Sequence, residues 1–126
     1  MHPNEKLLRQ AIEARAAGDE SGLAHCLHPE MVLHFPGTSA LAGDHHGPGS
    51  FGAKVRQITG HPLRIDVYDV LASDEHAVGV YLLHAERDGR SIQWRQVNVY
   101  RVSGGQIVEV WQHPFDQHAV DEFFGE

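Results

Sequence analysis

The spacing of apolar and polar residues along the chain predicts helices in its first half and strands in its second. Between Asn4, a suitable N-cap, and Gly18, a suitable stop, apolar residues recur at the three- and four-residue spacing of one helix face. Asp19 or Ser21 is placed to cap a second, shorter helix, which Pro29 ends. Two consecutive helices are therefore expected in the first thirty residues.

A short strand and a glycine-rich loop follow these helices. The apolar run 31–35 predicts the strand, and the loop 37–49 holds four glycines, one proline and the adjacent pair His45 and His46. Apolar residues at i, i+4 and i+7 after the loop predict a third helix, which Gly60 ends. Adjacent side chains in an extended loop point apart, so the two histidines are interpreted as part of a pocket mouth rather than as a metal site.

The remaining sequence predicts a β-meander followed by a short helix. Its strands are expected at about 63–71, 76–87, 91–102 and 106–113. The turn sequences between them are short, which implies antiparallel pairing of neighbouring strands. Asp116 is placed to cap the last helix. Helices first and strands afterwards indicate an α+β fold, and the chain shows no linker or repeat, which predicts a single domain over residues 1–126.

The strand expected at 91–102 has the least usual pattern. One of its faces carries Trp94, Gln96, Asn98 and Tyr100, an aromatic and amide surface that is neither plainly core nor plainly solvent-exposed. Apolar walls with a few fixed polar groups are typical of small-molecule pockets. This face is therefore predicted to line a pocket for a small organic molecule.

The register of the last hairpin decides which residues of the final strand share that face. The expected hairpin pairs Val102 with Ile107. This register places Trp111 and His113 on the pocket face, opposite the two amides of the neighbouring strand. A slip of one residue places Gln112 there instead. Both registers stay open at this point.

Composition and charge exclude several classes of partner. The net charge is −7 and the ten Lys and Arg residues are scattered, so neither nucleic acid nor an anionic membrane is expected as a partner. No apolar run approaches the roughly 20 residues of a membrane span. The N-terminal residues show no signal-peptide pattern, which predicts a cytoplasmic location. The single cysteine, Cys26, excludes an internal disulfide.

Several short stretches, taken in order and spacing, resemble the SnoaL-like branch of the nuclear-transport-factor-2-like superfamily. They are residues 17–19, 28–37, 41–43, 97–102, 105–111 and 115–116. The resemblance covers nearly the whole chain. It implies a cone-shaped fold, in which a curved, mainly antiparallel (mixed) sheet and about three N-terminal helices enclose a pocket. It also implies a homodimer formed through the outer face of the sheet.

The activity does not follow from this resemblance, because the scaffold hosts isomerases, dehydratases, cyclases, hydrolases and binding proteins. The catalytic Tyr, Asp and Asp of ketosteroid isomerase fall on Ala11, Phe35 and Asn98. Only Asn98 is able to donate a hydrogen bond, so steroid isomerisation by that mechanism is not expected. The catalytic sets of limonene epoxide hydrolase and of the polyketide cyclases are not reproduced either.

Three residues are the candidates for catalysis. His113 comes first, because the resembling family places pocket acids or bases near the end of this strand and an imidazole exchanges protons near neutral pH. His34 lies on the short strand, where alternation leaves its inward or outward orientation open. Asn98 is expected to hold an oxygen on which charge develops. The alternative for both histidines is a solvated strand residue without a chemical role.

The residues expected to contact the ligand are aromatic or polar. They are Phe35, Tyr81, Trp94, Gln96, Trp111 and Asp116. Ordinary core packing is the alternative for the aromatic residues, and helix capping is the alternative for Asp116. The sequence has no zinc or nucleotide motif, so no metal and no cofactor are expected.

Two functions therefore stay open. One is a cofactor-independent acid–base enzyme of the isomerase, dehydratase or cyclase type, acting on a small, partly apolar carbonyl or hydroxyl compound. The other is a non-catalytic module that binds such a compound for sensing, transport or regulation.

Overall fold

The computed structural model describes all 126 residues, which form four helices and one six-stranded sheet. The helices are α1 (Pro3–Ala17), α2 (Glu20–Cys26), α3 (Ser50–Thr59) and α4 (Gln117–Phe124). The strands are β1 (Leu27–Phe35), β2 (Gly43–His46), β3 (Arg64–Ala72), β4 (His76–Arg87), β5 (Arg90–Ser103) and β6 (Gln106–Pro114). The predicted α+β fold is confirmed.

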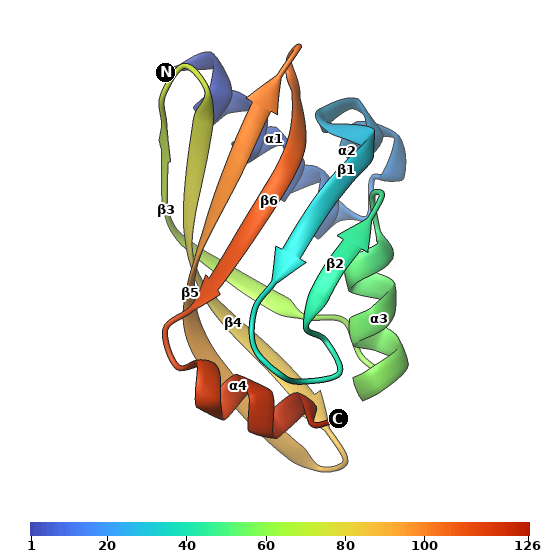
Figure 1. The fold of residues 1–126 in the computed structure, drawn as a ribbon. Coiled ribbons are helices and arrows are strands. Elements are labelled where there is room, and N and C mark those ends of the chain that lie inside the picture. Colours follow the sequence, from blue (N-terminus) through green and yellow to red (C-terminus); the bar gives the residue numbers. More distant parts are fainter.

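The sheet is mixed and strongly curved. Its strand order is β2-β1-β6-β5-β4-β3, with β1 and β6 parallel and every other neighbouring pair antiparallel. Figure 1 shows α1 running behind the sheet and α4 lying across the end where β4 turns into β5. That turn, Asp88-Gly89, has positive φ at both residues, 53° and 76°, as a two-residue hairpin of this twist requires.

Two strands depart from the sequence-based expectation. The loop expected at 37–49 contains β2, which pairs with β1 from Val32↔His46 to Phe35↔Gly43. The sequence of β2 shows no alternation of hydrophobic and polar residues, so it could not be predicted from the pattern. Only its backbone pairing with β1 makes it an edge strand of the sheet. β1 begins at Leu27, directly after α2, rather than at residue 31.

Local capping explains where three helices begin. The His2 side chain accepts a hydrogen bond from the backbone N–H of Asn4 at 3.0 Å, so α1 starts earlier than the expected Asn4 cap. Asp19 caps α2. Asp116 caps α4, accepting a hydrogen bond from the backbone N–H of Ala119 at 3.1 Å.

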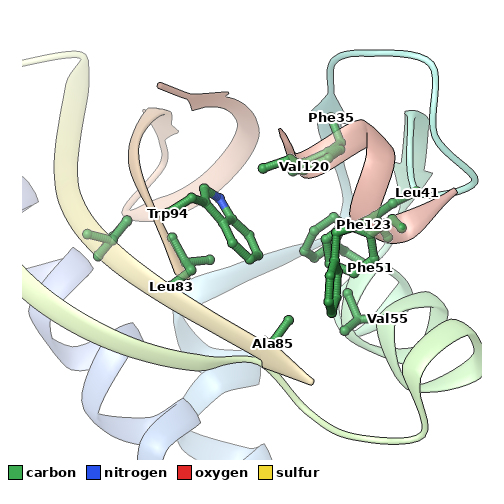
Figure 2. Packing of buried hydrophobic residues seen from close by; sticks show 11 residues of the cluster. Phe35, Leu41, Phe51, Val55, Leu83, Ala85, Trp94, Val120 and Phe123 are labelled. Atoms are coloured by element: carbon green, nitrogen blue, oxygen red, sulfur yellow. The ribbon is translucent and has the colours of Figure 1, made fainter. Parts of the chain in front are cut away.

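The concave inner face of the sheet and the helices that cover it form two buried clusters. The cluster nearer α3 and α4 has eleven buried residues and the cluster nearer α1 and α2 has eight. Figure 2 shows Trp94 and Leu83 of the sheet projecting toward Phe51 of α3 and Phe123 of α4. None of the four helices combines the length and hydropathy that a membrane-crossing helix needs.

Candidate functional site

A continuous row of hydrogen-bonded side chains runs along the inner face of β5. The indole Nε1–H of Trp94 donates to Gln96 Oε1 at 2.9 Å, and Gln96 Nε2 donates to Asn98 Oδ1 at 2.8 Å. Asn98 Nδ2 then donates to the Tyr100 hydroxyl at 3.1 Å. These four residues alternate along one strand, so their side chains share one face. We call this row, together with Tyr81, the inner-face ladder.

The ladder has a fixed direction because its first member is able only to donate. An indole N–H has no acceptor capacity, so Gln96 must present its oxygen to Trp94 and its nitrogen to the next residue. The same logic turns the nitrogen of Asn98 toward Tyr100. Every hydrogen bond of the ladder therefore points toward its phenolic end.

Two phenols close the ladder and leave one hydrogen without an acceptor. The hydroxyls of Tyr81 and Tyr100 lie 2.8 Å apart, and either is able to donate to the other. Because two hydroxyls carry two hydrogens and one hydrogen bond between them uses one, the accepting hydroxyl keeps its own hydrogen. The structure gives that hydrogen no acceptor. The end of the ladder therefore presents a free O–H donor.

A glycine makes this phenol pair possible. Gly79 lies on β4, two residues before Tyr81 on the same face and opposite Asn98. A Cβ added at Gly79 would collide with the hydroxyl and ring of Tyr81. The Tyr81 ring therefore packs over the backbone of Gly79, which has no side chain, and this position brings the Tyr81 hydroxyl to Tyr100.

Both phenols are held in their neutral form. Burial raises the pKa of Tyr81 above its ordinary value of 10, and the neighbouring Tyr100 raises it further. Burial also raises the pKa of Tyr100. Neither hydroxyl titrates near neutral pH, so both act as hydrogen-bonding groups rather than as proton carriers.

Gln112 extends the polar surface from β5 to β6. It lies directly opposite Asn98, is 5% exposed, and its Oε1 is buried without a hydrogen-bond partner. An unpaired buried amide oxygen costs about 1–3 kcal/mol. The other buried side-chain polar atoms have hydrogen-bond partners, so this oxygen indicates a position where a hydrogen-bond donor from outside the chain would fit.

Of the two registers that the sequence left open for the last hairpin, the structure has the one that brings Gln112 to the inner face, and this moves two candidates. Val102 does pair with Ile107, but the pairing skips one residue before it reaches Arg101↔Glu109, as in a β-bulge. His113 therefore lies opposite Val97 on the outer face and is exposed. The same shift puts Trp111 on the outer face, where it is half-buried, and brings Gln112 inside.

His34 also points away from the inner face. It stacks on Trp111 with ring centroids 5.8 Å apart. Its Nδ1 lies 2.6 Å from Asp44 Oδ1 and its Nε2 lies 2.6 Å from Glu109 Oε2. These hydrogen bonds with Asp44 and Glu109 raise the pKa of His34 and lower the pKa of each carboxyl group.

The structure thus gathers some of the predicted residues and separates others. Tyr81, Trp94, Gln96 and Asn98 come together on the inner face, and Phe35 is buried in the adjacent core cluster. The remaining candidates lie elsewhere: His34, Trp111 and His113 are on the outer face, and Asp116 is exposed at the start of α4.

Arg15, in the last turn of α1, was not among the candidates that the sequence indicated. Its positive charge lowers the pKa of Tyr81 and of Tyr100 and so opposes part of the effect of burial. The surrounding protein atoms lower the pKa of Arg15, although its side chain stays accessible to solvent. A single Arg near a helix end has no pattern that separates it from a surface residue, so only the fold reveals it.

Two shallow depressions lie away from this site. One, of about 500 Å³, is bounded by the start of β5 and by α4, and the other, of about 420 Å³, lies between α1 and α2. Neither is lined by a residue of the ladder. The enclosed pocket expected on the inner face stays a prediction. No three His, Cys, Asp or Glu side chains are grouped in a way that could hold a metal ion.

This curved sheet with its covering helices is the fold of solved proteins that are described as nuclear-transport-factor-2-like. The sequence model described as the SnoaL-like domain matches residues 8–110, and the chain belongs to this family. An uncharacterised protein of Mycobacterium tuberculosis (strain H37Rv) is 29% identical over 122 residues, which are 94% of this chain and 93% of that protein.

Solved structures show the same fold over nearly the whole chain. Bal32a, from a soil-derived mobile gene cassette, is 28% identical with a TM-score of 0.87, covering 98% of this chain and 97% of its own. A Xanthomonas campestris protein of unknown function with a cystatin-like fold is 25% identical with a TM-score of 0.85, and each chain is fully covered.

Two more distant structures contain small molecules. TerC, co-crystallised with polyporic acid, is 18% identical with a TM-score of 0.81, covering 98% of both chains. RV0760c from Mycobacterium tuberculosis, in complex with estradiol-17beta-hemisuccinate, is 21% identical with a TM-score of 0.72, covering 93% of this chain and 98% of its own. At these identities the likeness is one of fold alone.

Proposed function

We propose that this protein is a binding module for a small, partly apolar organic molecule, which lies against the inner face of the sheet. Gln112 Oε1 accepts a hydrogen bond from the ligand, and the free phenolic O–H of the ladder donates one to it. The observation that carries the proposal is the buried, unpaired oxygen of Gln112 beside the satisfied amides of the ladder. A bound hydroxyl or amide group would remove its desolvation cost.

The inner face supports binding better than acid–base catalysis. Its positions on β4, β5 and β6 carry amides, phenols, apolar side chains and, at the hairpin end, Arg87 and Arg90, with no carboxylate and no imidazole among them. His113 and His34, the two expected proton carriers, point outward. A general base has to lie within hydrogen-bond reach of the proton that it removes, and these residues lie across the sheet from the ladder.

The fold is also compatible with this role. TerC and RV0760c, which share it, were solved with polyporic acid and with estradiol-17beta-hemisuccinate. Both molecules combine an apolar body with oxygen-bearing groups, the combination that the ladder and its aromatic neighbours are suited to bind.

A thermal-shift experiment with these two compounds tests the proposal. A ligand at 100 times its Kd stabilises a protein by about 2.7 kcal/mol. For 126 residues this raises Tm by roughly 10 °C. We expect such a shift for the wild type and for His113→Ala, and its loss for Gln112→Leu. If the wild type converts a ligand chemically and His113→Ala does not, this proposal is contradicted and the protein is an acid–base enzyme instead.

We also propose that a second copy of the chain covers the outer face of the sheet. Half-buried apolar residues line the middle of that face and belong to neither core cluster: Val78, Val80, Val97, Val99 and Trp111. An uncovered apolar sheet face of this kind is typical of an interface. Light scattering after size-exclusion chromatography should give a dimer of the wild type and a monomer of Val97→Glu. A wild-type monomer at micromolar concentration would contradict the proposal.

A further inference from the structure

The inner face of the sheet has no room for a ligand while every helix stays in place. Gln96 is completely buried, and Trp94 and Asn98 are only 4% and 6% exposed. The Oε1 atom of Gln112 is buried as well. Side chains that are this closed to water leave no space for a ring system beside them. A ligand therefore reaches the ladder only when an element that covers it moves away.

The helix α4 covers the start of the ladder. Its side chains Val120, Phe123 and Phe124 are buried in the same cluster as Trp94 (Figure 2). The ring of Phe124 meets the Trp94 indole edge-on, with ring centroids 5.9 Å apart and ring planes at 88°. The apolar side chains of α4 thus occupy the space beside Trp94 in which the apolar body of a ligand would lie.

The position of α4 on the sheet separates it from the other long helices. α4 packs against β5 and β6, the strands that carry the ladder and Gln112. The main contacts of α1 and α3 with the sheet are to β2, β3 and β4. Moving α4 therefore uncovers the two strands that carry the polar groups of the site, and leaves the contacts of α1 and α3 in place.

Two polar contacts hold α4 in its covering position, and we call them the latch. Asp121 accepts hydrogen bonds from the backbone N–H of Thr38 at 3.1 Å and from its hydroxyl at 3.4 Å. At the other end of the latch, Arg87 Nη1 donates to the carbonyl oxygen of Phe124 at 2.6 Å. These bonds join α4 to other elements, so they are lost when the helix moves, and water is able to replace them.

We propose that α4 is a lid on the inner-face site, which turns outward at Phe115 when a ligand binds. The apolar body of the ligand then takes the place of Phe123 and Phe124 beside Trp94. This inference rests on the proposed binding function and adds the regulation of the same site. Because only molecules with an open lid bind, the strength of the latch sets the apparent affinity.

Two Asp→Ala substitutions in and beside α4 test the latch against a matched control. Asp121→Ala removes hydrogen bonds that exist only while the lid is closed. Asp116→Ala removes the N-cap bond to Ala119, which moves with the helix and is present in both positions of the lid. Each substitution removes one carboxylate, so a change in the net charge affects both variants alike.

The affinity of these variants for estradiol-17beta-hemisuccinate is measured by calorimetry. We expect Asp121→Ala to bind about tenfold more tightly than the wild type, although it unfolds at a lower temperature. Asp116→Ala should also unfold at a lower temperature, but its affinity should stay within about twofold of the wild type. A residue that only supports the fold would not raise affinity when it is removed.

A disulfide across the latch tests the movement itself. The double variant Thr38→Cys with Asp121→Cys places two thiols where the side chains are in contact, and Cys26 is buried and does not compete. The reduced form should bind as tightly as Asp121→Ala, and the oxidised form about a hundredfold more weakly or not at all. A melting temperature of the oxidised form at or above that of the reduced form shows that the fold is intact.

Hydrogen exchange reports where α4 lies in the complex. We expect the ligand to speed exchange in residues 115–126 and to slow it in β5. Slower exchange in residues 115–126 would mean that the helix closes over the ligand, and would overturn the inference. If the oxidised and reduced forms bind alike, or if Asp121→Ala binds no more tightly than the wild type, α4 is not a lid and the binding function stands. If neither the wild type nor Asp121→Ala binds the compound, the binding function fails and the inference fails with it.

Discussion

Replacing Gln112 by Leu should stabilise the protein, which is unusual for the loss of a buried polar side chain. Leu has nearly the volume of Gln, so the substitution leaves the packing of β6 against β5 in place. It removes an amide whose oxygen is buried without a partner. The free energy of unfolding should therefore rise by about 1–3 kcal/mol, the cost of an unsatisfied buried group.

The same substitution at Gln96, on the neighbouring strand β5, should have the opposite effect. Gln96 is also buried, but it accepts from Trp94 and donates to Asn98. Gln96→Leu leaves an indole N–H and an amide oxygen without partners. We expect a loss of about 2–4 kcal/mol, since each orphaned group costs about 1–3 kcal/mol and the added apolar side chain offsets part of it.

Urea unfolding of the two variants measures this contrast. For a chain of 126 residues, each kcal/mol corresponds to roughly 4 °C in Tm, so the two variants should differ by more than 10 °C in a parallel thermal scan. If Gln112→Leu is destabilised as much as Gln96→Leu, the oxygen of Gln112 has a partner in solution. The argument that this atom marks a ligand site would then be refuted.

Three further substitutions test the positions of single residues. Gly79→Ala should lower stability by about 1–3 kcal/mol in urea, because the added methyl group displaces the Tyr81 ring; an unchanged stability would mean that the ring does not lie over residue 79. Because the pKa of His34 is raised, its charged form stabilises the fold fully below pH 6.5, and this contribution is lost as pH rises through the raised pKa. The pKa of Glu109 is lowered, so its contribution is present above pH 4.5 and is lost as pH falls through the lowered pKa. His34→Gln should therefore flatten the alkaline side of the stability profile, and an NMR titration midpoint of His34 at or below 6.5 would contradict the expectation. Asp116→Ala should cost about 1 kcal/mol through loss of the α4 cap and leave ligand affinity unchanged; a fall in affinity would return Asp116 to the site.

The sequence predicted the family and most of the fold, because local chemistry determines them. The turn residues between the last four strands set the lengths of the strands almost to the residue. Helix ends followed from Gly18, Asp19 and Asp116. The edge strand β2 was missed, because it pairs with β1 through backbone hydrogen bonds and its glycine-rich sequence has no alternation of hydrophobic and polar residues.

The candidate site was predicted only in part, because one skipped residue decides which side chains of β6 face inward. Alternation along β5 correctly grouped Trp94, Gln96 and Asn98, since side chains on a single strand alternate without regard to partners. The irregular pairing at Arg101 depends on two strands together, and it places Gln112 rather than His113 on the inner face. A residue such as Arg15 depends on how a helix packs on the sheet, which no local pattern encodes.

The two tryptophans of the chain allow the most direct test of ligand binding at the inner face. Trp94 is buried in the ladder and Trp111 lies on the opposite face, so their two indole N–H signals report on the two faces separately. The signals are assigned with Trp111→Phe and followed by ¹⁵N NMR during titration with estradiol-17beta-hemisuccinate, one of the two compounds of the thermal-shift test. The account predicts that the Trp94 signal moves to saturation while the Trp111 signal stays in place. Movement of Trp111 alone would put the binding site on the outer face and contradict the account.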